Sequence, residues 1–131
     1  MIGLDTNVVV RYMMQDDPKH SSKATRLIEG LTIERPDYLP LVAIVELVWV
    51  LSSSCGLKRG DLAEALDLLL RSKEIIVDRT DLVLQANRRF AQADADFADC
   101  LIERIAHARG CETTMTFDAG AVKAARMSLV A

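Results

Sequence analysis

The chain has 131 residues, of which half are hydrophobic and 27% are charged, a composition typical of one folded domain rather than of a disordered segment. Its formal net charge of −3 excludes a broad basic surface for nucleic acid, so any nucleic-acid contact has to be local. The longest apolar run, Leu39 to Leu51, is interrupted by Pro40 and Glu46 and is too short to span a membrane. No secretory signal is visible at the N-terminus. We therefore expect a single domain over residues 1–131, no membrane partner and a cytoplasmic location.

Strand-like and helix-like patterns alternate along the whole chain, without a linker or an internal repeat. In chain order they predict a strand at 2–4, helices at 7–14 and between Pro18 and Gly30, a strand at 38–41, helices at 42–54 and 61–73, a strand at 74–77, helices at 80–90 and 96–109, a strand-like run at 111–117, a helix at 119–126 and an edge strand at 128–130. This alternation favours an α/β fold with a parallel sheet.

The triplet Asp5-Thr6-Asn7 directly follows the first predicted strand. Ligands bind at the carboxyl ends of strands in open α/β sheets, so Asp5 is placed for a binding role. All three residue types are also favoured as helix N-caps. From the triplet alone, capping and ligand binding by Asp5 have about equal weight. Both interpretations of Asp5 remain open at this point.

Glu46 is the only ionisable side chain between residues 39 and 55. Its neighbours one helical turn away are all apolar, so it belongs to no polar stripe and is not expected on a solvated face. Glu46 is then either a buried carboxylate paired with an Arg or Lys, or a ligand in a pocket.

Two aspartates open the helix predicted at residues 96–109. Asp96 and Asp99 are three residues apart and therefore lie on one face of the first turn. Considered alone, the pair is better explained by helix stabilisation than by ligand binding. An N-cap and a first-turn acid satisfy free N–H groups and complement the helix dipole. One acid can nevertheless cap the helix while the other coordinates an ion.

Asp118 follows the strand-like run ETTMTF and so also stands at the carboxyl end of a strand. Thr116, two positions earlier, points to the same side of that strand. A turn or cap role for Asp118 before Ala119-Gly120 is an equally weighted alternative.

A shared site explains these acids together, whereas separate caps would require four or five independent coincidences around one sheet edge. Clustered carboxylates repel one another and need a cation, and an all-oxygen set without paired His or Cys suits Mg²⁺ or Mn²⁺. Such ions bridge carboxylates to substrate phosphate and make hydroxide from bound water. Phosphodiester hydrolysis is therefore the predicted chemistry.

Four segments in this order resemble a known family: the N-terminal DTN, the single Glu in VAIVELVWVL, the run DFADCLI and the segment GCETTMTFDAGA. Together they resemble the PIN-domain ribonucleases, and among them the VapC toxins of bacterial toxin–antitoxin pairs. The resemblance covers nearly the whole chain, and it is the combination that is specific, since DTN alone is not.

The resemblance implies a three-layer α/β/α fold with a parallel sheet of about four to five strands flanked by helices. It assigns catalysis and metal binding to Asp5, Glu46, Asp99 and Asp118, with Asp96 as a further acid on the same rim. It also makes Asn7 and Thr116 polar supports that hold carboxylates by hydrogen bonds.

The activity implied is that of a Mg²⁺- or Mn²⁺-dependent endoribonuclease that acts as the toxin of a toxin–antitoxin pair. The partners implied are an RNA substrate, a cognate antitoxin that blocks the acidic groove, and a second copy of the chain in a homodimer. One feature departs from the family, in which basic residues often follow the last acid. Here Asp118 is followed by Ala119-Gly120, and the nearest cations are Lys123 and Arg126.

Other functions fit parts of the same pattern. An aspartyl-phosphate phosphatase would want a second acid two residues after Asp5, but position 7 is Asn. A non-catalytic PIN-like partner-binding module remains an alternative, although none of the acids is missing. A PIN nuclease with a non-toxin role in RNA processing is the other alternative.

The remaining aromatic and cysteine residues are expected mainly in the core, because stacking surfaces need exposure and no Cys stands at metal-ligand spacing. These residues are Tyr12, Trp49, Phe90, Phe97, Cys55, Cys100 and Cys111.

Overall fold

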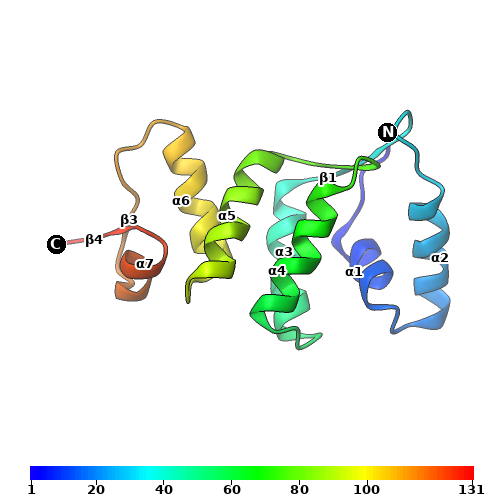
Figure 1. The fold of residues 1–131 in the computed structure, drawn as a ribbon, viewed down its shortest axis with the longest axis horizontal. Helices are drawn as coiled ribbons and strands as arrows, with labels where there is room; N and C mark the ends of the chain where they lie inside the picture. The colour runs from blue at the N-terminus through cyan, green and yellow to red at the C-terminus, as the bar shows by residue number, and fades with distance from the viewer. The chain divides into compact units, whose positions relative to one another are not determined.

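The computed structural model describes all residues, 1–131, and the chain forms two compact units, Met1–Thr80 and Asp81–Ala131. The elements in chain order are α1 (Thr6–Met14), α2 (Pro18–Glu29), β1 (Asp37–Leu39), α3 (Leu41–Ser53), α4 (Arg59–Arg71), β2 (Ile75–Val77), α5 (Thr80–Gln92), α6 (Phe97–Ala108), β3 (Met115–Thr116), α7 (Ala119–Ala124) and β4 (Ser128–Leu129) (Figure 1). Every predicted helix is present within a few residues of its expected bounds. None of these helices has the length and apolar character needed to cross a membrane.

All strand pairs are parallel, which confirms the α/β class predicted from the alternation. β1 pairs with β2, so that Tyr38 lies opposite Ile76, and β3 pairs with β4, so that Thr116 lies opposite Leu129. The strands form two separate two-stranded sheets, whereas one sheet of about four to five strands was expected. The strands have only three or two residues each.

The N-terminal segment lies beside β1, as expected for the first predicted strand, although only Gly3 and Tyr38 form a bridge. The backbone N–H of Leu4 donates to the carbonyl of Tyr38 at 2.8 Å, and the N–H of Tyr38 donates to the carbonyl of Ile2 at 2.9 Å. Asp37 completes this pairing, because its Oδ1 accepts from the N–H of Ile2 at 3.1 Å. Asp5 therefore follows a segment whose backbone is held in register.

Helices α3 and α4 form much of the core of the first unit. Ile44, Leu47 and Leu51 recur at helical spacing on α3, and Leu62 and Leu66 do so on α4; all five are fully buried. Each such side chain contributes about 1.5–3 kcal/mol by leaving water. This packing fixes which face of α3 remains outside, and Glu46 lies on that outer face.

An aromatic pair lies in the core of the second unit. Phe90 near the end of α5 and Phe97 at the start of α6 are both buried, and their rings meet edge to face with centroids 5.8 Å apart at 86°. The contact joins α5 to the first turn of α6. That turn carries Asp99.

Two residues expected in the core lie outside it. Trp49 is 66% exposed because it lies on the face of α3 opposite Ile44 and Leu47. Cys111 is exposed because it follows the turn at Gly110, whose φ of 99° ends α6. Cys100 is buried as expected, Cys55 is partly buried, and no disulfide forms.

We expect Asp37→Ala to lower the free energy of unfolding by about 1–3 kcal/mol, because it removes the acceptor of the Ile2 N–H. Asp37 is 2% exposed, and its Oδ2 has no hydrogen-bond partner. Asp37→Asn keeps an acceptor oxygen and removes this poorly satisfied charge, so it should be at least as stable as the wild type. Urea unfolding of the three proteins measures both effects. An Asn variant as unstable as the Ala variant would contradict this expectation.

Candidate functional site

Asp5 is the N-cap of α1, and it leaves half of its carboxylate available. Its Oδ1 accepts from the backbone N–H of Thr6 at 2.7 Å, whereas its other oxygen accepts no hydrogen bond. The side chain is exposed and follows Leu4, which is buried in the core. The two interpretations of Asp5 are therefore compatible, because one oxygen caps the helix and the other is free to bind a ligand.

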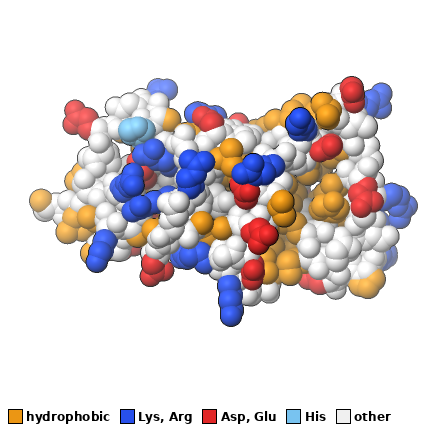
Figure 2. All heavy atoms as spheres, in the orientation of Figure 1, with side chains coloured by type: hydrophobic (Ala, Val, Ile, Leu, Met, Phe, Trp, Pro, Cys, Tyr) orange, Lys and Arg blue, Asp and Glu red, His pale blue; other side chains and the backbone are white.

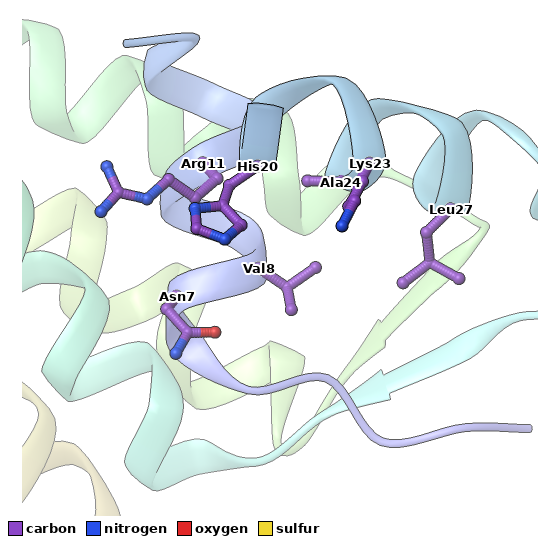
Figure 3. Close-up of a pocket in the computed structure, with 7 residues that line it drawn as sticks. All are labelled: Asn7, Val8, Arg11, His20, Lys23, Ala24 and Leu27. Atoms are coloured by element: carbon purple, nitrogen blue, oxygen red, sulfur yellow. The ribbon is translucent and has the colours of Figure 1, made fainter. Parts of the chain in front are cut away.

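Asn7 lines a cavity of about 430 Å³ formed by α1 and α2 (Figure 3). Val8 and Leu27 supply apolar surface to this cavity, and Arg11, His20 and Lys23 line it as well. No hydrogen bond joins Asn7 to the carboxylate of Asp5. Asn7 therefore does not support the carboxylate of Asp5 through a direct hydrogen bond.

Glu46 lies on an exposed face of α3, contrary to the expectation that its face is not solvated. Val42 and Trp49, which lie four residues before it and three after it, are 74% and 66% exposed. Apolar neighbours suggested burial, but they belong to an outer apolar face, since the opposite face of α3 supplies the core. Glu46 forms no hydrogen bond or ion pair, which rules out a buried pair with Arg or Lys.

Asp96 is the N-cap of α6, as predicted, and it holds the backbone of Asp99. Its Oδ1 accepts from the backbone N–H of Asp99 at 3.1 Å. Asp99 lies in the first turn of α6 and is partly buried, and its own carboxylate accepts no hydrogen bond. Capping thus occupies Asp96 and leaves the carboxylate of Asp99 free.

Asp118 is the N-cap of α7, which is the structural role that the sequence left open. Its Oδ1 accepts from the N–H of Gly120 at 2.8 Å. Thr116 supports it, because the hydroxyl oxygen of Thr116 accepts from the backbone N–H of Asp118 at 3.0 Å. Thr116 therefore fixes the backbone of Asp118 rather than its carboxylate.

Asp96 and Asp118 lie close enough to Asp99 for their charges to affect its ionisation. Partial burial raises the pKa of Asp99 above its ordinary value, and the negative charges of Asp96 and then Asp118 raise it further. The starts of α6 and α7 are therefore near each other. We refer to Asp96, Asp99 and Asp118 as the carboxylate group, because the charges of the first and the last both act on Asp99.

A hard divalent cation fits the chemistry of this donor set. The acids offer only oxygen atoms, and none of the five predicted ligands is neutralised by Lys, Arg or His. No three acidic, His or Cys side chains are grouped closely enough to hold an ion in this conformation. Asp5 and Glu46 belong to the first unit, and Asp96, Asp99 and Asp118 belong to the second.

A family model of the PIN domain matches residues 2–127. The chain belongs to the PIN-domain family. PIN domains are α/β proteins and are generally nucleases that use divalent metal ions. The match extends over both units of this PIN-domain chain and includes all five predicted acids. None of the curated proteins matches the chain significantly.

Sequence reasoning missed Asp37 as a positioning residue of the PIN-domain chain. Its carboxylate holds the N–H of Ile2, three residues before Asp5, so it helps to fix where Asp5 begins α1. The signal in the sequence was a single acid directly before the predicted strand at 38–41. A lone acid at a strand boundary is common, and nothing in the pattern linked it to the N-terminus.

Proposed function

We propose that this PIN-domain chain is a Mg²⁺- or Mn²⁺-dependent endoribonuclease and acts as the toxin of a toxin–antitoxin pair. The observation that carries the proposal is the group of three carboxylates at the starts of α6 and α7, which no basic side chain neutralises. Such a group is unfavourable without a cation. PIN domains generally use divalent ions for nuclease chemistry.

The proposed metal ligands are Asp5, Glu46, Asp96, Asp99 and Asp118, of which all but Asp96 are proposed to be essential for catalysis. A bound Mg²⁺ or Mn²⁺ would make the attacking hydroxide from water and offset the charge that develops on the phosphate oxygens. The chain itself holds these acids in place: Asp96 fixes the backbone of Asp99, and Thr116 fixes that of Asp118.

Incubating the purified protein with total RNA tests the proposed activity. We expect internal cleavage in Mg²⁺ or Mn²⁺ and none when EDTA removes the metal, because the proposed nucleophile is metal-bound water. An Asp118→Asn protein purified in the same way is the control for contaminating ribonucleases. Cleavage that persists in EDTA, or in the Asp118→Asn preparation, would contradict the proposal.

The toxin role requires a cognate antitoxin that silences the acidic site. A cation is the simplest block, so we expect the antitoxin to present an Arg or Lys to the proposed ligands and exclude the metal. Expression of the chain alone in the bacterial cytoplasm should arrest growth, and co-expression of the antitoxin should restore it. Removing the basic residue should restore RNA cleavage by the purified complex, whereas unchanged inhibition would indicate that steric wrapping is sufficient.

A homodimer is also part of the proposal. Large apolar side chains remain exposed on α3 (Val42 and Trp49) and on α4 (Leu68), and dimer interfaces are enriched in such surface. Most leucines between Leu62 and Leu70 are buried in their own unit, so Leu68 is the leucine of this region that remains exposed for contact with a second copy. Light scattering at micromolar concentration should give twice the 14.5 kDa of one chain. A monomer mass would reject the dimer.

A further inference from the structure

A polar pocket of about 210 Å³ lies within the second unit, formed by α5, α6 and the residues that follow α7. Four arginines line it: Arg88 and Arg89 on α5, Arg104 on α6, and Arg126 after α7. Glu103 is the only acidic residue in the lining. We refer to this site as the arginine pocket.

The arginine pocket has an excess of positive charge that the protein does not neutralise. The guanidinium of Arg104 donates two hydrogen bonds to the carboxylate of Glu103, each 2.9 Å long, and this pair is internally balanced. Arg89 donates to the backbone carbonyl of Ala124 at 2.7 Å, which orients it without cancelling its charge. Arg88 and Arg126 form no ion pair.

The backbone of Arg126, which lines the pocket, adopts an unfavourable conformation. Its φ of 61° lies in the left-handed region, which glycine adopts more readily than a residue with a side chain. Non-glycine residues in this region are uncommon and concentrate at functional sites. Arg126 therefore keeps this conformation while its side chain lines the pocket.

The pocket adjoins the carboxylate group through α6. Cys100, Glu103 and Arg104 line the pocket, and Asp99 immediately precedes Cys100 on the same helix. Figure 2 shows Lys and Arg side chains gathered over α5 and α6, although the chain as a whole has a net charge of −3. This is the local basic surface that an acidic protein needs in order to hold a polyanion.

We propose that the arginine pocket binds a backbone phosphate of the RNA substrate, next to the carboxylate of Asp99 on α6. The planar fork of an arginine matches two phosphate oxygens, and a pocket lined by four arginines suits an anionic phosphate better than a neutral nucleobase. The inference rests on the proposed ribonuclease function for its choice of polyanion. It supplies the RNA contact that the Ala119-Gly120 sequence after Asp118 does not provide.

Binding can be measured without cleavage, using a fluorescein-labelled single-stranded RNA of mixed sequence in EDTA and fluorescence anisotropy over a range of salt concentrations. The first variant is Arg126→Gly, which removes the cation and also relieves the left-handed backbone, so the protein should fold at least as well. Arg79→Gly is its matched control, because Arg79 also has a positive φ, of 51°, but does not line the pocket. Thermal melts of both variants verify folding.

We expect Arg126→Gly to weaken RNA binding by about 3–10-fold at low salt and the double variant Arg88→Gln/Arg126→Gly by more than about tenfold. The slope of log K against log salt should fall by roughly 0.7 for each phosphate of the single strand that a variant no longer neutralises. Arg79→Gly should bind as the wild type does. Equal binding by all four proteins, or an equally weakened Arg79→Gly, would overturn the proposal.

Two further outcomes separate the possible failures. If polyglutamate of matched charge competes as well as unlabelled RNA, the pocket serves an acidic peptide and the RNA proposal is wrong. If the variants lose RNA binding but the wild type never cleaves RNA in Mg²⁺ or Mn²⁺, the arginine pocket stands and the proposed ribonuclease function fails.

Discussion

Asp99→Asn should reduce RNA cleavage by at least about two orders of magnitude while leaving the metal-free protein as stable as the wild type or more stable. Activity should fall because the ion that makes the nucleophile loses a ligand. Stability should hold because the substitution removes a charge that partial burial and the neighbouring Asp96 and Asp118 make unfavourable. A cleavage assay in Mg²⁺ or Mn²⁺, paired with thermal melts in EDTA, measures both quantities.

Asp61→Asn is the matched control, because Asp61 is likewise an acid in the first turn of a helix, α4. If Asp99 served only the helix dipole, the two variants would behave alike, with a small loss of stability and no loss of activity. A less stable and fully active Asp99→Asn protein would therefore contradict the metal-site proposal.

The stability effect of Asp99→Asn should also depend on pH. The pKa of Asp99 is raised in the folded protein from its ordinary value of 3.8. Ionised Asp99 is therefore less favourable in the folded state than in the unfolded chain, and the fold loses stability as pH rises through the raised pKa. The advantage of the Asn variant should be present at neutral pH and should vanish near about pH 3, where Asp99 is protonated in both states. Melts at both pH values check this sign.

Glu46→Gln should reduce RNA cleavage to a similar extent, with a change in stability of no more than about 0.5 kcal/mol. The carboxylate is exposed and forms no hydrogen bond or ion pair, so the fold gains nothing measurable from its charge. Cleavage kinetics and urea unfolding of the same preparations separate the two effects.

Glu64→Gln provides the comparison, since Glu64 is another exposed Glu on a helix of the first unit. It should retain full activity and equal stability. If Glu46→Gln were as active as Glu64→Gln, Glu46 would have no part in catalysis.

The order and type of the elements could be predicted because the local signals agreed. Pro18 begins α2 and Gly30 caps its end, and the helical spacing of leucines placed α4 correctly. Strand pairing could not be obtained in the same way. A strand of two or three residues leaves only a brief pattern, and its partner is chosen by contacts distant in the sequence.

The roles of the acids were only partly readable from the sequence. The N-cap roles of Asp96 and Asp118 follow from residue type and position, and the structure confirms both. The solvation of Glu46 was wrongly predicted, because an apolar helix can keep apolar side chains such as Val42 and Trp49 on its outer face. The arginine pocket was missed, since it is formed by two helices and the two residues after a third.

Trp49 is an intrinsic fluorescence probe of the outer face of α3. It is the sole tryptophan of the chain, it is 66% exposed, and it lies three residues beyond Glu46 on the same outer face of α3. An indole in water emits at longer wavelength than one in an apolar contact, so covering this face shifts and changes its fluorescence. If the proposed antitoxin or a second copy covers this face, its binding can be followed on the unlabelled protein, because the chain has no second tryptophan to obscure the signal.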